Sequence, residues 1–223
     1  MIDKNYLKVL KELGFEEIIL DKPILNQNQK SNNQIDKIEE LNKIYEEIKA
    51  CTKCDLHKNR TNPVLGEGNI NAKIMFIGEA PGEEEDKQGR PFVGKAGKLL
   101  TKCIENAGYR REEVYIANIN KCRPPNNRTP TIEEQETCIP FLLRQIEIIN
   151  PKVLCLLGAT AYRGIFKKEA KITKERGSIL ELMGKKVYIT YHPAYVLRNP
   201  KEEETFCQDI KNVFKLAGEW FGL

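Results

Sequence analysis

The stretch KIMFIGEAPG, residues 73–82, decides the fold. It begins as an unbroken apolar run and ends in glycine and proline, which is typical of a buried strand followed by a tight turn. Similar runs follow at 114–120 (VYIANIN), 152–158 (KVLCLLG) and 185–193 (KKVYITYHP), and segments with helical spacing lie between the first three, at 96–107 and 132–149. Apolar strands that alternate with helices indicate a parallel sheet covered on both faces. The sequence therefore predicts an α/β fold.

Two weaker signals extend this pattern toward the end of the chain. The run SILELMG, residues 178–184, is expected to pair as a hairpin with the strand that follows it. The segment 202–221 reads as a closing helix. In open parallel sheets the chemistry gathers at the carboxyl ends of the strands, so the residues directly after each run are the candidates for a site.

The beginning of the chain has a different character. Residues Asn26–Gln34 are polar and without periodicity, which predicts a flexible linker. A short amphipathic helix is predicted before it, over Asn5–Leu13, and a longer helix after it, over Ile35–Ile48. We therefore expect an N-terminal extension and linker over 1–34, with a role that the sequence does not reveal, and one globular domain over 35–223.

Composition narrows the class of protein. Of 223 residues, 36 are Lys or Arg and 32 are Asp or Glu, so the net charge is +4. This mild positive balance is compatible with a polyanionic partner but does not prove one. No apolar run reaches the ~18 residues of a membrane span, and the opening residues alternate charged with apolar side chains, unlike a signal peptide. We expect a cytoplasmic protein without a membrane partner.

The seven cysteines fall into two groups. Their odd number, in a chain without an export signal, argues against a disulfide framework. Cys51 and Cys54 form a Cys-x2-Cys pair, and with Cys122 and Cys138 they would make a four-thiolate site suited to an iron–sulfur cluster or to zinc. Spacing alone does not choose between the two. The other three, at 103, 155 and 207, are expected to be buried thiols.

A saturated four-thiolate site has no open position for a substrate, so its expected role is structural. It would tie the segment before the first strand to the loop after the second.

Three strand ends carry side chains suited to binding a small planar ligand. The first strand is followed by Gly78-Glu79-Ala80-Pro81-Gly82, where the backbone permits close approach, and by Phe92, which is either a stacking platform or a core residue. Asn118 ends the second strand, and its amide offers one donor and one acceptor in a fixed pair. Asn120 is a competitor, because alternation places it on the same face. His192 follows the last strand, and is either part of the site or a structural residue.

Two charged stretches lie beside these strand ends. Lys121, Arg123 and Arg128 form a small basic group that suits phosphates but also fits a solvated loop. The acidic run Glu83–Asp86 reads as a solvated loop.

Taken together, these residues resemble the family 4 uracil-DNA glycosylases from Cys51 to about Asp209. The matching pieces are Cys51-x2-Cys54, GEAPGEEED with QGRPFVGKAGKLL, NINKCRPPNNRTP with Cys138, and HPAYVLRNP. The resemblance implies a three-layer α/β/α fold with a central four-stranded parallel sheet, a 4Fe–4S cluster, and excision of uracil from single- or double-stranded DNA. By the same likeness the cluster ligands are Cys51, Cys54, Cys122 and Cys138. The uracil pocket is formed by Gly78, Glu79, Ala80, Phe92, Asn118 and His192.

The resemblance also suggests roles for individual residues. Phe92 would stack on the base while Asn118 reads its edge, and His192 would stabilise the negative charge that develops on uracil O2. The best-studied branch of the superfamily has Asp where this chain has Ala80, so Glu79 is the nearest group to position water or to balance the sugar cation. Outside the pocket the DNA-contact candidates are Arg123 and Arg128, together with Tyr195, Val196, Leu197 and Arg198 as wedge and phosphate contact.

Two rival classes stay open at this point. A non-catalytic iron–sulfur DNA-binding protein would keep the cysteines and the basic loops but would need no pocket. A glycosylase branch that stays covalently attached to its DNA is marked by an inserted basic loop with a His, and this chain has no His between 58 and 191. We expect a monomer, and the sequence leaves open which of Glu83, Glu84 and Glu85 excludes thymine.

Overall fold

The structure is a computed structural model that describes residues 33–218. Within that range the strands form one sheet in the order β1-β3-β2-β4-β6-β5. Their bounds are β1 Glu67–Gly68, β2 Ile74–Gly78, β3 Tyr115–Asn118, β4 Val153–Leu157, β5 Ile179–Leu182 and β6 Lys185–Thr190. Strands β3, β2, β4 and β6 pair in parallel, which confirms the predicted central sheet of four parallel strands. Antiparallel strands flank it at both edges: β5 is the predicted hairpin partner of β6, and β1 was not predicted.

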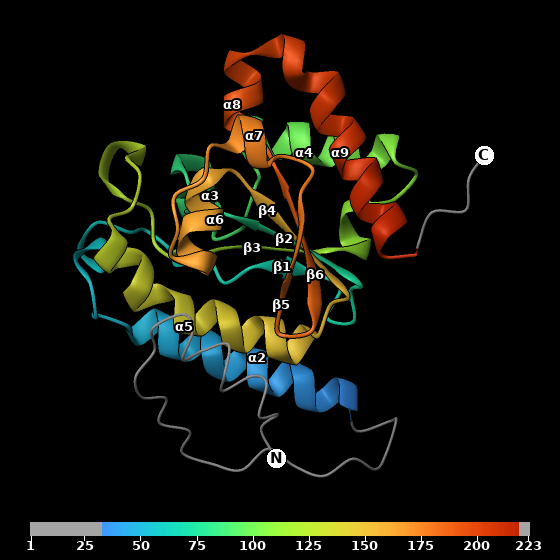
Figure 1. Cartoon of the computed structure of the whole chain (residues 1–223). Helices are drawn as coiled ribbons and strands as arrows, with labels where there is room; N and C mark the ends of the chain where they lie inside the picture. The colour runs from blue at the N-terminus through green and yellow to red at the C-terminus, as the bar shows by residue number, and fades with distance from the viewer. Residues whose placement is uncertain (1–32, 219–223) are drawn as a thin grey trace.

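Helices cover both faces of the sheet (Figure 1). Their bounds are α2 Asn33–Ala50, α3 Glu83–Gln88, α4 Lys95–Asn106, α5 Ile132–Ile149, α6 Ala159–Phe166, α7 Ile172–Glu175, α8 Pro193–Arg198 and α9 Glu203–Leu216. Short 3-10 turns cover Asp55–Lys58, Arg111–Glu113, Pro125–Asn127 and Pro200–Glu202. No helix among residues 33–218 is long and apolar enough to cross a membrane.

Alternation along the buried strands divides the core into two layers. Phe76, Ile116 and Cys155 point to the face covered by α4, α8 and α9, whereas Met75 and Leu154 point to the face covered by α5 and α6. Every residue of β2, β3 and β4 is buried, as expected for strands sandwiched between helices. This arrangement produces the predicted three-layer α/β/α fold.

The longest helices agree closely with the sequence pattern. Helix α5 covers the predicted residues 132–149, and its start is fixed by Thr131, whose hydroxyl accepts a hydrogen bond from the Glu134 amide while the Glu134 carboxylate caps the Thr131 amide. Helix α2 begins at Asn33, two residues before the predicted helix. The predicted helix over Asn5–Leu13 and most of the predicted linker lie outside the described residues.

Helix α2 packs along α5 and belongs to the folded body (Figure 1). Ile44 and Ile48 are fully buried in a cluster with Phe141 of α5. The Arg144 guanidinium of α5 donates to both carboxylate oxygens of Glu47. The last two turns of α2 therefore hold the chain that enters Cys51 against the centre of α5.

The acidic run and two of the cysteines differ from prediction. Glu83–Asp86 begin the short helix α3 rather than a solvated loop, and the buried Asp86 carboxylate accepts hydrogen bonds from the backbone amides of Thr61 and Asn62. Cys103 and Cys207 form a disulfide instead of remaining thiols, because α4 and α9 pack side by side and bring their Cα atoms to 4.7 Å. The cysteine prediction was wrong for this pair, whereas Cys155 is a buried thiol as expected.

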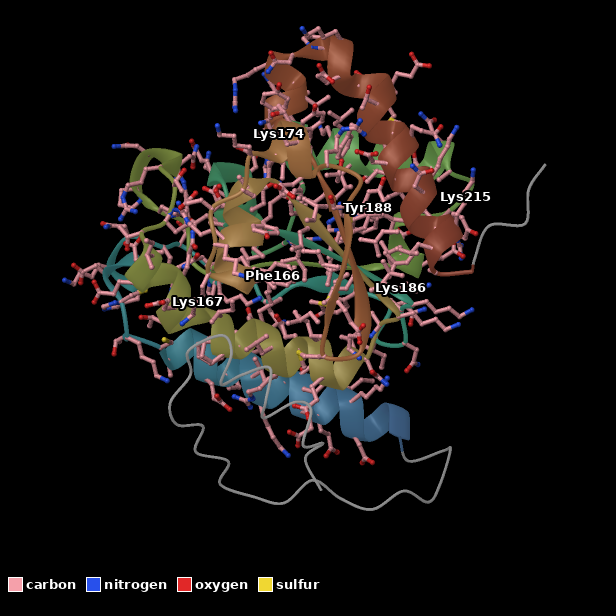
Figure 2. All side chains as sticks on the ribbon, viewed as in Figure 1. Phe166, Lys167, Lys174, Lys186, Tyr188 and Lys215 are labelled. Carbon is pink, nitrogen blue, oxygen red and sulfur yellow. A yellow bond between two sulfur atoms is a disulfide. The ribbon has the colours of Figure 1, made fainter. Side chains whose placement is uncertain are left out.

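A buried carboxylate joins the last strand to the last helix. Asp209 of α9 accepts hydrogen bonds from the hydroxyls of Tyr188 and Thr190 and from the Arg176 guanidinium. Figure 2 shows Tyr188 between β6 and α9. This network fixes the carboxyl end of β6, two residues before His192.

Candidate active site

A pocket of about 390 Å³ opens at the carboxyl ends of β2, β3 and β6. It is lined by Glu79, Ala80, Pro81, Gly82, Glu85, Phe92, Ala96, Asn118, Pro124, Asn127, Arg128, Thr129, His192, Ala194, Tyr195 and Arg198. The fold thus brings together the three strand ends that sequence reasoning singled out, as the topology of a parallel sheet requires.

Asn118 supplies a buried acceptor to this pocket. It ends β3 beside Gly78 of β2, and only 1% of its surface is exposed. Its Oδ1 atom is buried and accepts no hydrogen bond from the residues that the structure describes. Buried acceptors are normally satisfied, because an unmet one costs ~1–3 kcal/mol, so this atom is poised to take a donor from a ligand.

Gly78 makes this geometry sterically possible. A Cβ atom added there would lie 2.5 Å from Asn118 Oδ1 and 2.4 Å from the Phe92 ring. Any larger residue at position 78 would therefore displace the Asn118 and Phe92 side chains, which both line the pocket.

Phe92 forms one wall and is both buried and conformationally unusual. Its ring lies 5.9 Å from the His192 imidazole, with 37° between the planes. Its backbone has φ of 50°, in the left-handed region that bulky residues rarely adopt. The ring is therefore held in a fixed place by its surroundings rather than by its own backbone preference.

His192 stands at the start of α8 and faces the pocket. Its Nδ1 accepts a hydrogen bond from the Ala194 amide at 3.1 Å. The pKa of His192 is lowered to about 4, chiefly by desolvation and then by the positive charge of Arg198, while the charge of Glu85 opposes the shift. The imidazole is therefore neutral near pH 7, and because Nδ1 accepts, its proton sits on Nε2. His192 is a neutral donor.

The acidic residues near the pocket have different surroundings. Glu79 is half-buried in the pocket wall, next to the methyl group of Ala80. Glu85 also lines the pocket, and its carboxylate accepts hydrogen bonds from the amides of Val93, Gly94 and Gly82. Glu83 instead pairs with Lys87 on the surface.

The six predicted DNA-contact residues divide into three groups. Tyr195 and Arg198 line the pocket mouth, and Leu197 is 43% exposed beside them. Arg128 lines the mouth while both of its terminal nitrogens donate to Glu134, and half-buried Arg123 donates to Asn127 and Glu83. Val196 is 1% exposed, so its prediction as a contact was wrong: the helical turn of α8 directs it into the core.

Asn120 is separated from the pocket despite its alternation with Asn118. Strand β3 ends at Asn118, and beyond it the chain turns, so that the Asn120 side chain donates to the Glu134 carbonyl of α5 at 2.8 Å. Asn120 therefore supports the loop that carries Arg128 instead of facing a ligand.

A wider, open groove of about 760 Å³ continues past Phe92 along α4. Its lining includes Lys95, Lys98 and Lys102, of which Lys102 pairs with Glu203. We place the chemistry in the smaller pocket, because the buried acceptor and the neutral imidazole converge there.

The four predicted metal-ligand cysteines line a separate, small cavity. It is bounded by Cys51, Cys54, Cys122 and Cys138, together with Ile48, His57, Arg60, Lys121, Thr137 and Phe141. The Arg60 guanidinium donates to Cys122 Sγ at 3.1 Å and the Lys121 amide donates to Cys138 Sγ at 3.3 Å. Within residues 33–218, no three His, Cys, Asp or Glu side chains are grouped to hold a single metal ion.

Burial makes bare thiolates unfavourable in this cavity. Desolvation raises the pKa of the Cys138 thiol to about 12 and also raises the pKa of Cys122 and Cys54. Four cysteines that line one cavity, with hydrogen-bond donors to the sulfurs of two of them, supply the donor type that a thiolate-bound metal cluster needs.

Residues 65–215 match the family model of the uracil DNA glycosylase superfamily. A type-4 uracil-DNA glycosylase of Thermotoga maritima is 60% identical over 168 residues, which are 74% of this chain and 88% of the relative. The chain belongs to the type-4 uracil-DNA glycosylases. A second type-4 enzyme, from Archaeoglobus fulgidus, is 48% identical over 190 residues, 82% of this chain and 96% of the relative. A type-5 uracil-DNA glycosylase of Pyrobaculum aerophilum is more distant, at 32% over 149 residues, 59% of this chain and 66% of the relative.

The structure places two further residues beside the site that the sequence alone does not assign. Glu85 was one of three unranked glutamates, and its position in the pocket wall now separates it from Glu83. The second residue is Arg111, whose guanidinium donates to the Phe92 carbonyl. A lone Arg before a strand carries no local signal of such a role, because its partners lie at distant positions in the sequence.

Proposed function

We propose that this chain hydrolyses the N-glycosidic bond of deoxyuridine in DNA, releases uracil, and leaves an abasic site for base excision repair. Family membership supports the class of reaction. The observation that carries the proposal in this chain is the buried, unpartnered Oδ1 of Asn118, set between Gly78 and the Phe92 ring. Asn120 Oδ1 is also buried and without a partner among the described residues, but of the two only Asn118 lines the pocket.

Base reading follows from the two ends of the Asn118 amide. Uracil presents a donor at N3 and an acceptor at O4, so Oδ1 can accept the N3 proton while the amide nitrogen donates to O4. Cytosine presents the opposite pattern at this edge. A mismatched base would leave buried groups unpaired, which costs ~1–3 kcal/mol for each group.

Leaving-group stabilisation is assigned to His192. Cleavage of the glycosidic bond leaves positive charge on the sugar and negative charge on uracil O2. The neutral imidazole, with its proton on Nε2, is a preplaced donor for that oxygen, and such a contact is typically worth ~3 kcal/mol in the barrier. The Phe92 ring, close to the imidazole, would stack on the base.

Glu79 is the proposed partner of the attacking water or of the sugar cation. It lines the pocket together with Ala80, whose methyl side chain carries no carboxylate. Glu85, which also lines the pocket, is the proposed element that excludes the methyl group of thymine.

Access to uracil in a duplex requires the nucleotide to leave the base stack, at a cost of a few kcal/mol. Exposed Leu197 is the proposed wedge, with Tyr195 and Arg198 beside it at the pocket mouth. Arg123 and Arg128 are proposed to contact phosphates on the opposite lip, and the lysines of the α4 groove suit a flanking strand. We propose that both single- and double-stranded DNA are substrates and that the enzyme acts as a cytoplasmic monomer.

The cysteine cavity is proposed to hold a 4Fe–4S cluster. Cys51, Cys54, Cys122 and Cys138 would be its ligands, and their convergence on one cavity supports that set. A cluster saturated by four protein thiolates supplies structural cross-linking rather than a substrate position. It would fasten the end of α2 to the loop after β3 and to α5.

The decisive experiment measures release of free base from single strands containing uracil, thymine or hypoxanthine, with a visible absorption spectrum of the same sample. We expect release of uracil alone and a brown protein with iron–sulfur absorption. DNA binding without release of uracil would contradict the proposed reaction. A covalent protein–DNA product would favour the covalently attached branch instead, and a colourless, fully active protein would overturn the cluster.

A further inference from the structure

The backbone at Phe92 needs external support. A φ of 50° is unusual for a residue with a large side chain, and such conformations persist only where the surroundings over-determine them. In this protein the residue with this conformation is Phe92, whose ring forms one wall of the pocket. The groups that hold its backbone therefore decide where that ring stands.

Arg111 fixes the two carbonyl groups on one side of the turn. Its Nη1 donates to the Phe92 carbonyl at 2.9 Å and to the Thr101 hydroxyl at 3.2 Å, while its Nη2 donates to the Pro91 carbonyl. A fork of donors on two successive carbonyls restrains the peptide plane between them, as a single contact would not.

The other sides of the turn are closed by Glu85 and by α4. The Glu85 carboxylate accepts from the amides of Val93 and Gly94, both at 2.8 Å. A Cβ atom at Gly97 of α4 would lie 1.9 Å from the Phe92 carbonyl oxygen, so the helix backbone is in direct contact with the turn.

Arg111 is itself held by a carboxylate that it shares with a second arginine. Its Nε and Nη2 donate to Glu67 Oε1 at 3.1 and 2.9 Å, and Arg90 donates to the same carboxylate at 2.7 and 3.1 Å. The Arg111 side chain is 12% exposed, whereas that of Arg90 is 57% exposed. Of the two arginines, Arg111 makes the contacts with the Phe92 turn, and Arg90 is its natural control.

We propose that Arg111 is a positioning residue for base recognition: it holds the left-handed backbone of Phe92 and so presets the ring against Asn118 and His192. This inference rests on the proposed function of the pocket. Arg111 itself does not touch the base. It acts by removing the need to order the stacking ring when the base arrives, which is the general effect of preorganisation.

The test compares Arg111→Ala with Arg90→Ala, because both remove one arginine from the same carboxylate. Since misplacement of a binding group by 1 Å can reduce a rate ~100-fold, we expect Arg111→Ala to slow single-turnover uracil release about 30-fold and to weaken inhibition by free uracil about tenfold. Affinity for an undamaged single strand should change little. Arg90→Ala should stay within about threefold of the parent in uracil release and in inhibition by free uracil.

A double-mutant cycle with Phe92→Ala separates positioning from general stability. If Arg111 acts through the ring, Arg111→Ala should have almost no further effect on uracil release once Phe92 is Ala. Equal fold losses in the two backgrounds would overturn the proposal. Arg111→Lys, whose ammonium can still reach one carbonyl, should recover part of the lost release and provides a folded variant if the alanine is unstable.

Hydrogen exchange distinguishes this inference from the function on which it rests. The amides of Val93 and Gly94 should exchange about tenfold faster in Arg111→Ala and unchanged in Arg90→Ala, whether or not the protein releases uracil. Unchanged exchange in Arg111→Ala would contradict the inference directly. A parent protein that releases no uracil would instead contradict the proposed function.

Discussion

The pocket at the carboxyl ends of β2, β3 and β6 differs from the cysteine cavity in whether its buried polar groups have hydrogen-bond partners within the protein. In the pocket, Asn118 Oδ1 has no partner among the described residues, and the His192 imidazole keeps a proton for an outside acceptor. In the cavity, four cysteines line one space, and backbone and side-chain donors already approach the sulfurs of two of them. An unmet acceptor that lines an open pocket indicates a site for a passing ligand, whereas a set of like ligands around one small cavity indicates a resident structural group. The equally unmet Oδ1 of Asn120 does not line the pocket.

The two regions are only a few residues apart along the chain. Buried Lys121 connects them: its ammonium donates to the Asn118 carbonyl at 2.7 Å and to Gln145 at 2.6 Å, and its amide donates to Cys138 Sγ. Damage at the cysteines can therefore reach Asn118 through one residue, whose backbone contacts Cys138 and whose side chain contacts Asn118. Variants of the pocket and of the cysteine cavity must therefore be compared in two quantities, the rate of uracil release and the stability of the fold.

The largest effect on chemistry is expected at His192. His192→Ala should lower single-turnover release of uracil by ~100-fold or more, because it removes the donor at the developing oxyanion, and it should change DNA affinity little. His57→Ala is the matched control, since His57 is the other histidine of the chain and borders the cysteine cavity. Equal losses of release and of DNA affinity in His192→Ala would indicate a binding or structural residue.

Asn118 should come next, with a change of specificity that no structural residue would produce. Asn118→Ala should reduce uracil release about 30-fold, as expected for two lost contacts of ~1 kcal/mol each. Asn118→Asp should lose uracil activity and gain traces of activity on cytosine, because a carboxylate can accept a hydrogen bond from the cytosine amine. Both are measured on matched uracil- and cytosine-containing single strands, where base flipping costs little. Parental release by Asn118→Ala would assign base reading to another residue.

Cys122 should affect stability more than chemistry. Cys122→Ser should lose iron and lower the unfolding temperature together, because a saturated thiolate site contributes folding energy. Uracil release per folded molecule, measured well below the unfolding transition, should stay within about tenfold of the parent. Cys155→Ala should retain iron, since that buried thiol lies outside the cavity. Retention of full iron content by Cys122→Ser would remove Cys122 from the ligand set.

The smallest effect concerns pH. With its pKa lowered to about 4, His192 stays neutral down to about pH 5, so uracil release should show no His192 titration between pH 5.5 and 8. In the unfolded chain the imidazole titrates near its ordinary value of ~6.5, so the unfolded state binds more protons between those values and stability rises with pH across that window. If the parent lost uracil release with an apparent pKa near 6.5 and His192→Ala did not, the pKa of His192 in the folded protein would not be lowered.

The sequence predicted the parts of the fold that depend on local patterns. The parallel strands are centred on short apolar runs, and their carboxyl ends meet at one edge, so the sequence alone places Asn118 and His192 in one crevice. The spacing of the cysteines suggested the four-thiolate set, and the resemblance favoured an iron–sulfur cluster over zinc. The structure brings those four residues to one cavity.

What the sequence did not reveal depends on packing between distant segments. Cys103 and Cys207 are 104 residues apart, and nothing in either neighbourhood indicates that α4 and α9 adjoin. Val196 lies in a short stretch whose helical turn, not its composition, directs it inward. Arg111 has meaning only because the Phe92 turn and Glu67 of β1 converge on it.

The central claim is that chemistry belongs to the pocket and stability to the cysteine cavity. Single-turnover release of uracil from a single strand, measured for the parent, His192→Ala and Cys122→Ser at one temperature where all three are folded, tests it most directly. The account predicts a loss of ~100-fold or more for His192→Ala with its iron retained, and at most about a tenfold loss for Cys122→Ser with its iron gone. Abolished release in folded Cys122→Ser, or parental release in His192→Ala, would contradict it.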